Sequence, residues 1–294
     1  LILQAPADMH LHAPQYPMTG TGMDLPLIDW LNTYVFPTEA KFADPGYARE
    51  IYRRLARDLI ACGTTRVCIF SSLHPEGTLI LMEELERAGV AGYAGKVNMD
   101  RNCASLSEDT KRSMEQTEYW LDRCRFPHVR PILTPRFTPA CTDELLAFLG
   151  DLARTQRLPV QSHLSENPGE VKLVRQLMPE AAFYGDGYDR YGLFGGAAQT
   201  ERVTLPHDAM LSMPRSADAL SGPGMAYFHG ANIEYVKWDM NRQLSEVGNE
   251  ILPPERQREI WHRYVLGVYE MQERLLTDFP DLLLENCAGG GSRF

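Results

Sequence analysis

The chain has 294 residues, of which 44% are apolar, enough to form the buried core of one large domain or two small ones. Its 39 acidic and 29 basic residues give a net charge of -10, which argues against nucleic acid or anionic lipid as a standing partner. The sequence contains no apolar run of about eighteen residues, the length of a membrane span. We therefore expect a cytoplasmic protein and exclude a disordered tail.

The start of the chain, LILQAPADMHLH, lacks the basic segment and long apolar core of a signal peptide. Because the chain begins with leucine and ends in GGGSRF, we expect both ends to be cut from something longer. The 6 cysteines stand singly, without C-x-x-C pairs, and are predicted to be small buried apolar residues in a reducing compartment.

Short apolar runs alternate with longer segments of helical period, a pattern typical of parallel strands connected by helices. The predicted strands cover residues 65–71, 94–99, 129–135, 158–163, 202–206, 233–238 and 282–287. The predicted helices cover residues 48–61, 78–88, 107–124, 142–155, 169–178 and 254–279. This alternation predicts an α/β fold of the TIM-like barrel type, with a doubly wound open sheet as the alternative.

Two helix starts and one composition change mark the chain's organisation. Thr142, followed by two acidic residues, is predicted to be an N-cap, and Pro254 is predicted to be a first helical residue. Between about residues 195 and 230 the chain is rich in Gly, Ala, Ser and Pro, and the expected helical pattern is weak. We place a seam in this stretch.

Four of the 8 histidines stand at predicted strand ends. His10 and His12 are two residues apart, so a strand would project both imidazoles from the same face. His163 closes the strand PVQSH, and His207 closes RVTLPH. Because the carboxyl ends of barrel strands gather at one face, these positions predict a metal site there, with a packing role for the histidines as the alternative.

Five motifs then carry a resemblance to a known family: MHLHAPQYP, GTGMDLPLIDWLNTYVFPTEAKFAD, GKVNMDRN, TPRF and HLSEN. In this order and spacing they resemble the guanine deaminases of the amidohydrolase superfamily, from about residue 7 to residue 193. The resemblance implies one zinc ion per chain in a metal-dependent α/β barrel. It assigns His10, His12 and His163 as zinc ligands and Glu166 as the proton shuttle, and His207 is a degraded match to a further site histidine.

The same resemblance implies residues that recognise the purine. Gln15, Arg136 and Phe137 match the family's guanine contacts, and Trp30 and Leu31 match a wall of that site. Arginine suits this role because its planar guanidinium presents paired donors to a purine carbonyl and ring nitrogen. Without the surrounding motifs, a strand-end salt bridge and a core aromatic residue would be the simpler interpretation of Arg136 and Phe137.

The last part of the chain resembles a different family. The segments ANIEYVKWDMNRQLSEVGNE, PPERQREIWHRYVLGVYEMQERL and LLLENCAGGGSRF are similar to bacterial α-galactosidases, which are retaining glycoside hydrolases with their own barrel. Asp239 matches their catalytic nucleophile, and the sugar-contacting motifs cover Lys237, Asn241, Cys287 and Gly290. No counterpart of the second carboxylate is present, so we expect an incomplete glycosidase.

Asp239 has a second interpretation, because the guanine deaminase pattern needs an aspartate at the end of its final strand. If the borrowed strand 233–238 completes the barrel, Asp239 is predicted to take that catalytic, metal-completing position. Only a few residues separate the preceding YFH run from this strand, too few for the crossover that parallel neighbours require. The YFH run is therefore expected to be a loop, with LLLENC as a replacement strand.

The sequence thus predicts a chimeric chain with an amidohydrolase-like barrel portion at 1–207, a seam at 208–230 and an α-galactosidase-like strand-helix-strand segment at 231–294. The expected activity is hydrolytic deamination of guanine to xanthine and ammonia, intact or impaired. An α-galactosidase fragment and a non-catalytic metal-binding barrel are the alternatives. The expected partner is a small purine, without nucleic acid or membrane, and a homodimer is compatible with the sequence.

Overall fold

The computed structural model describes residues 5–22, 24–103, 106–164, 168–181, 184–194, 203–207, 233–238 and 252–286. The strands are β1 (Ala7–His12), β2 (Arg66–Phe70), β3 (Ala91–Gly95), β4 (Val97–Asn98), β5 (Val129–Pro131), β6 (Thr134–Pro135), β7 (Val160–Gln161), β8 (Val203–His207), β9 (Ile233–Trp238) and β10 (Leu283–Asn286). The longer helices are α3 (Pro45–Ala61), α4 (Pro75–Ala88), α5 (Thr110–Arg123), α6 (Asp143–Gln156), α7 (Pro168–Leu177) and α10 (Ile260–Asp278).

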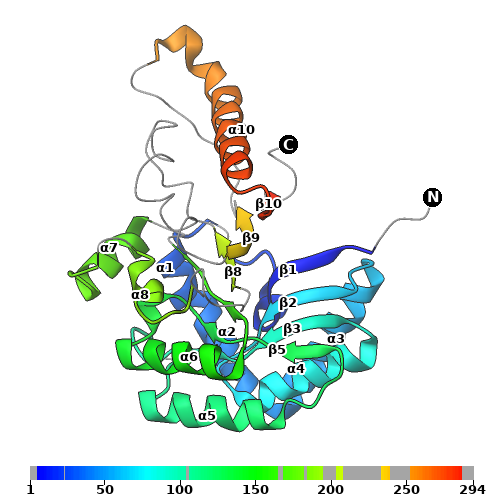
Figure 1. The fold of residues 1–294 in the computed structure, drawn as a ribbon. Coiled ribbons are helices and arrows are strands. Elements are labelled where there is room, and N and C mark those ends of the chain that lie inside the picture. The colour runs from blue at the N-terminus through cyan, green and yellow to red at the C-terminus, as the bar shows by residue number, and fades with distance from the viewer. Residues whose placement is uncertain are drawn as a thin grey trace.

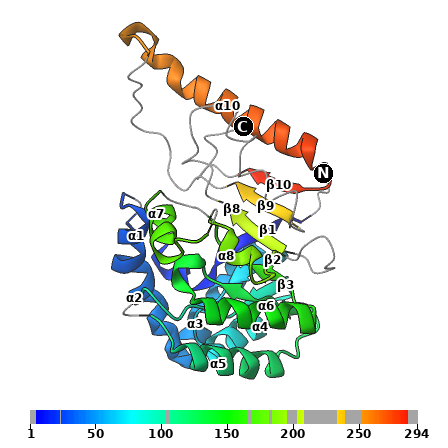
Figure 2. The same ribbon diagram turned by 60° about the vertical axis from the view of Figure 1, so that its left-hand side comes forward.

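All described strand pairs are parallel, and they follow the order of the chain. One sheet runs β1-β2-β3-β5, a short pair joins β4 to β6, and a further sheet runs β7-β8-β9-β10. Isolated bridges join Leu133, between β5 and β6, to Val160 of β7, and Phe137, after β6, to His163, after β7. Helices α3, α4, α5 and α6 lie outside the first sheet (Figures 1 and 2). This arrangement is the TIM-like α/β barrel type that the sequence predicts.

The helices pack on the strands through continuous apolar faces. In α3, Ile51, Tyr52, Leu55 and Leu59 are buried, at the spacing that places them on one side of a helix. Asp44 caps this helix by accepting hydrogen bonds from the first turn, and Pro45 occupies its first position. The apolar core of the barrel portion therefore lies between the helical layer and the strands, and it holds the strand ends in place.

Most predicted elements are confirmed within a few residues. The predicted N-cap Thr142 accepts a hydrogen bond from the Leu145 N–H, 3.3 Å away. Pro254 begins a 3₁₀ turn, η7 (Pro254–Glu259), that leads into α10. The predicted strand 282–287 is present as β10, whereas the predicted seam at 208–230 and the YFH run lie outside the described residues.

The predicted strand 94–99 is wrong in its start and its continuity. The structure has β3 at Ala91–Gly95 and a separate β4 after Lys96, whose buried side chain forms an ion pair with Glu108. A Cβ on Gly95 would lie 1.8 Å from the hydroxyl oxygen of Thr134, so only glycine fits this crossing. The β3 strand therefore lacks the β-branched residues on which the prediction relied.

A chain of short helical turns follows β1, and the sequence analysis did not predict it. These turns are η1 (Ala13–Met18), α1 (Leu27–Trp30), the π-helical η2 (Leu31–Val35), α2 (Phe36–Glu39) and η3 (Ala40–Ala43). They follow the carboxyl end of β1 in the chain, and Leu31, Val35, Phe36 and Glu39 are buried in them. Their tight turns bring residues of this segment toward the strand ends.

Strands β9 and β10, from the last part of the chain, continue the sheet that contains β7 and β8. Strand β9 pairs with β8 from Val203↔Ile233 to His207↔Trp238, and β10 pairs with β9. Helix α10 stands away from the other helices in both views (Figures 1 and 2). Among the described helices, none combines the length and the hydropathy needed to cross a lipid bilayer.

The prediction for the cysteines is confirmed in part. Cys68, Cys103 and Cys141 are buried, and burial raises the pKa of the Cys141 thiol to about 12. Cys124 is half-buried, and Cys62 is exposed near the end of α3, so the prediction of a buried residue is wrong there. Cys62 is the C-cap of α3 and lies beyond Leu59, the last buried residue of this helix.

Candidate metal centre and neighbouring cluster

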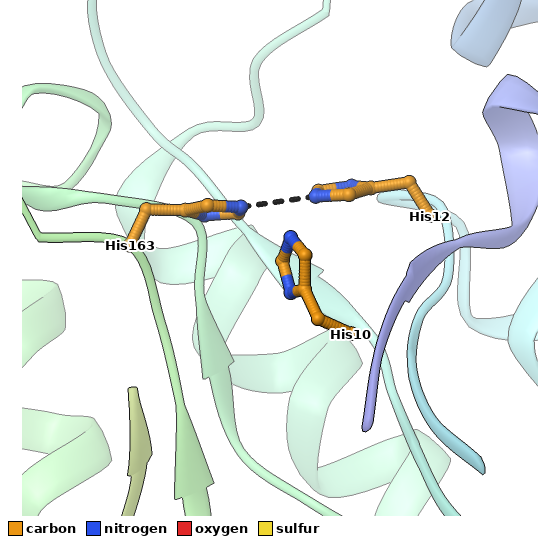
Figure 3. A group of neighbouring side chains, drawn as sticks. All are labelled: His10, His12 and His163. Carbon is orange, nitrogen blue, oxygen red and sulfur yellow. Dashed lines mark hydrogen bonds between the residues drawn. The ribbon is translucent and has the colours of Figure 1, made fainter. Parts of the chain in front are cut away.

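Three imidazoles from distant parts of the chain converge at the carboxyl ends of the strands. His10 and His12 project from β1, and His163 follows β7. One ring nitrogen of each lies within 4.8 Å of the others, and Nε2 of His12 and Nε2 of His163 are 2.9 Å apart. Figure 3 shows the rings of His12 and His163 pointing at each other, with the His10 ring directed between them. The predicted pairing on one strand face is thus observed.

The three rings rest on a single aromatic side chain, Phe70, at the end of β2. The ring centroid of Phe70 lies 4.4 Å from that of His12, 4.6 Å from that of His163 and 5.1 Å from that of His10. Phe70 is fully buried, so its ring restricts how far the imidazoles can rotate. The sequence analysis placed Phe70 in a strand but did not connect it with the histidines.

The main chain at Arg136 fixes the orientation of His163. The Nδ1–H group of His163 donates a 2.6 Å hydrogen bond to the carbonyl oxygen of Arg136. A carbonyl oxygen only accepts, so this bond places the proton on Nδ1 and leaves Nε2 with its lone pair directed at His12. Such a bond on the far nitrogen is the usual support of a metal-ligating histidine.

A buried ion pair lies next to this centre. The Nη1 and Nη2 atoms of Arg136 donate to the two carboxylate oxygens of Glu39 at 2.6 and 3.0 Å, and the two side chains are 3% and 0% exposed. The amide nitrogen of Gln15 donates to the same carboxylate at 3.4 Å. Glu39 thus gathers two of the predicted purine contacts, although the sequence analysis did not single it out. Arg136 does take part in a salt bridge, as the simpler interpretation expected.

The other predicted contacts belong to an apolar cluster that adjoins the ion pair. Phe137 and Leu31 are 7% and 6% exposed in this cluster, and Trp30 packs against it. Its buried members are Met18, Leu31, Val35, Phe36, Phe70, Leu73, Val97, Met99, Cys103, Leu106, Phe137 and Ala140. The indole N–H of Trp30 donates to the carbonyl oxygen of Thr21 at 2.8 Å. Because Phe70 belongs to this cluster, its apolar wall continues to the histidines.

Three predicted site residues cannot be placed with their side chains. Glu166 lies outside the described residues, as does Asp239, which directly follows β9. His207 is the last residue of β8, and its main chain pairs in register with Trp238. The structure describes the main chain of His207 but not its side chain. Their roles remain predictions.

The donor set suits a first-row divalent metal. Imidazole nitrogens are common zinc ligands, and catalytic zinc sites combine three protein ligands with an open position. The three histidines supply three such nitrogens, with His163 already held in the tautomer that exposes Nε2. His10, His12 and His163 are therefore the residues that could hold a metal ion here.

Comparison with known proteins defines the class of the chain. The amidohydrolase family model matches residues 2–234, so the chain belongs to the amidohydrolase family. Within it, the chain is similar to the guanine deaminase of Mus musculus, 40% identical over 210 residues, which are 70% of this chain and 45% of that protein. A solved guanine deaminase from C. acetobutylicum with bound guanine matches with a TM-score of 0.69 and 40% identity over 79% of this chain and 52% of that chain.

A second family matches the end of the chain. The Melibiase model matches residues 210–294, overlapping the amidohydrolase match at residues 210–234. Alpha-galactosidase 1 of Pediococcus pentosaceus is 61% identical over 62 residues, which are 21% of this chain and 8% of that protein. Both predicted resemblances are confirmed, and the chain spans about half the length of the mouse guanine deaminase that it matches.

Proposed function

We propose that the chain carries the active site of a zinc-dependent guanine deaminase, which converts guanine and water to xanthine and ammonia. The observation that carries the proposal is the convergence of His10, His12 and His163 at the strand ends, beside the Arg136–Glu39 pair. Similarity to guanine deaminases over 70% of the chain supports the choice of substrate. The expected partner is accordingly a small purine, and the cytoplasmic location and the homodimer stay predictions.

In the proposed reaction, the three histidines hold one zinc ion. Bound there, zinc would act as a Lewis acid and lower the pKa of a water molecule toward neutrality. Glu166 takes the first proton of the attacking water and delivers it to the purine ring nitrogen next to C2. It then moves the second proton, from the new C2 hydroxyl, to the amino group, so that the C–N bond breaks, ammonia leaves and the C2 carbonyl of xanthine forms. His207 is the last residue of β8, and Asp239 directly follows β9, the neighbouring strand. We assign both residues to the same centre.

The purine is positioned by side chains of the segment after β1 and of the turn after β6. Arg136 and Gln15 bind its polar edge, the Phe137 ring stacks on its face, and Trp30 and Leu31 form a wall. The buried apolar cluster around Phe137 supports this assignment because a flat, largely apolar ligand gains affinity from such surroundings. The polar groups then select the orientation of the ring.

We further propose that 1–207 forms the barrel portion, 208–230 the seam and 231–294 a borrowed segment that completes the barrel. Two observations support this division. The two family models overlap at residues 210–234, and β9 and β10 extend the sheet that contains β7 and β8. A borrowed segment of this kind accounts for a barrel whose last part departs from its family.

The α-galactosidase similarity of the last segment favours a second candidate, glycoside hydrolysis with Asp239 as nucleophile. Retaining hydrolysis needs two carboxyl groups about 5 Å apart on either side of the scissile bond. The match covers only 8% of that α-galactosidase, so this candidate ranks below deamination. A third candidate is a metal-binding barrel without turnover.

One experiment separates the three candidates. Purified protein is analysed for zinc, then assayed for ammonia release from guanine and for hydrolysis of an aryl α-galactoside. Zinc with ammonia release supports guanine deamination, and zinc without turnover supports the non-catalytic barrel. Hydrolysis of the galactoside without ammonia release would replace the proposed function with the second candidate.

A further inference from the structure

Glu39 is a buried carboxylate with no role in the chemistry proposed above. It lies at the end of α2, 97 positions before Arg136 in the sequence, and is 0% exposed. Its carboxylate accepts both hydrogen bonds from the Arg136 guanidinium and one from the Gln15 amide. Through these contacts a single side chain holds the two polar residues assigned to the purine.

The contacts leave specific groups for a ligand. Binding through Nη1 and Nη2 commits one N–H of each to Glu39, which leaves Nε–H and the second N–H groups of the guanidinium. The amide nitrogen of Gln15 faces Glu39, so its oxygen faces away as an acceptor. The pair thus presents donors from Arg136 and an acceptor from Gln15, which match the carbonyl and N–H edge of a neutral oxopurine.

The ion pair also sets the charge of the site. Arg136 alone would present a buried positive charge, which attracts anionic ligands strongly when water is excluded. Glu39 cancels this charge at hydrogen-bond distance. The Phe36 ring, 5.0 Å from the guanidinium carbon, covers it with an apolar surface rather than with a further charge.

We propose that Glu39 is the specificity-determining residue of this site: it positions Arg136 and Gln15 and neutralises Arg136, so that the site selects neutral oxopurines over anionic ones. This inference rests on the proposed function. A purely structural Glu39 would stabilise the buried arginine without affecting which purine binds. The two roles differ in one measurable quantity, the ratio of affinities for a neutral and an anionic purine.

The test measures binding by calorimetry at neutral pH, with the zinc-loaded 294-residue chain and two purines that have no amino group to lose. Hypoxanthine is a neutral oxopurine, and urate is an anion at this pH. In Glu39→Gln, hypoxanthine affinity should fall at least about tenfold, as expected for losing a charge-assisted contact, while urate affinity should rise. Zinc content and circular dichroism report whether each variant is folded and loaded.

Two further variants separate charge from position. Glu39→Asp keeps the charge but shortens the side chain, so both affinities should fall while their ratio stays that of the unmodified protein. The double variant Glu39→Gln, Arg136→Gln removes both charges and leaves no unpaired buried ion, so it should fold even if Glu39→Gln does not. In the double variant the gain in urate affinity should disappear.

A matched control is Glu84→Gln. Glu84 is also a buried carboxylate, 2% exposed, but it lies on α4 and is bound by Arg49, Arg53 and Arg87. Its variant should lose stability and keep the purine affinity ratio. If hypoxanthine binds the unmodified protein but the ratio is the same in Glu39→Gln, the inference for Glu39 is wrong and the proposed function stands. The same holds if the double variant, which has no uncompensated arginine, binds urate more tightly than the unmodified protein does. If neither purine binds the unmodified protein, both are wrong.

Discussion

The imidazole of His163 and the main chain of Arg136 are joined by a 2.6 Å hydrogen bond from Nδ1 to the carbonyl oxygen. The N–H group of Arg136 in turn donates to the carbonyl oxygen of Asn98 at 3.1 Å, so its peptide position is fixed from both sides. The side chain of the same residue is held by Glu39. Arg136 therefore connects the histidine cluster, through its main chain, with its own guanidinium and Glu39, which lie where the purine is proposed to bind.

We predict that His12→Ala abolishes stoichiometric zinc binding, because His12 supplies one of only three clustered imidazoles in the described part of the chain. The measurement is the metal content of purified protein, expected at about one zinc per unmodified chain. His128→Ala is the matched control, since His128 is 70% exposed and binds Glu86. A double variant His10→Ala, His12→Ala that retained stoichiometric zinc would overturn the metal assignment.

We predict that Glu166→Gln keeps its zinc and loses guanine turnover by at least about a hundredfold, since a general acid or base contributes roughly 10²- to 10⁴-fold. Glutamine preserves the size of the side chain but cannot move the proton. The measurement is kcat for ammonia release, with zinc content determined on the same sample. Glu180→Gln, at an exposed carboxylate bound to Arg190, should keep the unmodified rate. An unchanged kcat in Glu166→Gln would contradict the shuttle role.

We predict that Asp239→Asn lowers zinc affinity about tenfold or more if the borrowed strand places this carboxylate at the metal. The prediction rests on β9, which ends at Trp238 and pairs with β8 up to His207. Competition with a chelator gives the affinity. If zinc affinity and deaminase rate both stay unchanged, Asp239 has no function at this centre.

The strands could be predicted because their apolar runs are local. The segments 66–70 and 233–238 are rich in Val, Ile and aromatic residues, and both form strands where expected. The β3 strand, AGYAG, lacks this signal because its glycines are selected by close approach to β2 and Thr134. Steric selection by a neighbour distant in sequence leaves no periodic pattern to detect.

In the candidate site, too, the residues marked by a local pattern could be predicted, and those defined by contacts distant in sequence could not. His10 and His12 could be paired from their spacing alone, since alternate residues of a strand share a face. Glu39 and Phe70 could not be assigned, because their roles depend on contacts with Arg136 and with His163, 97 and 93 positions away in the sequence. The short turns between β1 and α3, which deliver Glu39, carry no helical repeat long enough to predict.

We predict a loss of stability on mild acidification that depends on His74. Burial lowers the pKa of His74 from its ordinary value of 6.5, with Lys96 and Arg112 acting in the same direction and Glu108 and Glu39 opposing it. The unfolded chain therefore binds the proton more readily, so this contribution to stability is complete above pH 6.5 and declines as the pH falls toward the lower folded value.

The measurement compares the free energy of unfolding of the unmodified protein and of His74→Asn by urea titration at several pH values. Asparagine suits this position because residue 74 is the N-cap of α4. Nδ1 of His74 has no hydrogen-bond partner among the described residues, so the substitution breaks no hydrogen bond of that atom within this part of the chain. Equal pH dependence in the two proteins would contradict the prediction.

The most direct test of the account is ammonia release from guanine by the zinc-loaded chain, measured beside its Glu166→Gln variant at equal zinc content. We expect steady ammonia production with xanthine in equal amount from the unmodified chain, and at least about a hundredfold less from the variant. Zinc-loaded protein that releases no ammonia from guanine, or releases it equally from both proteins, would contradict the assignment of this site as a guanine deaminase centre.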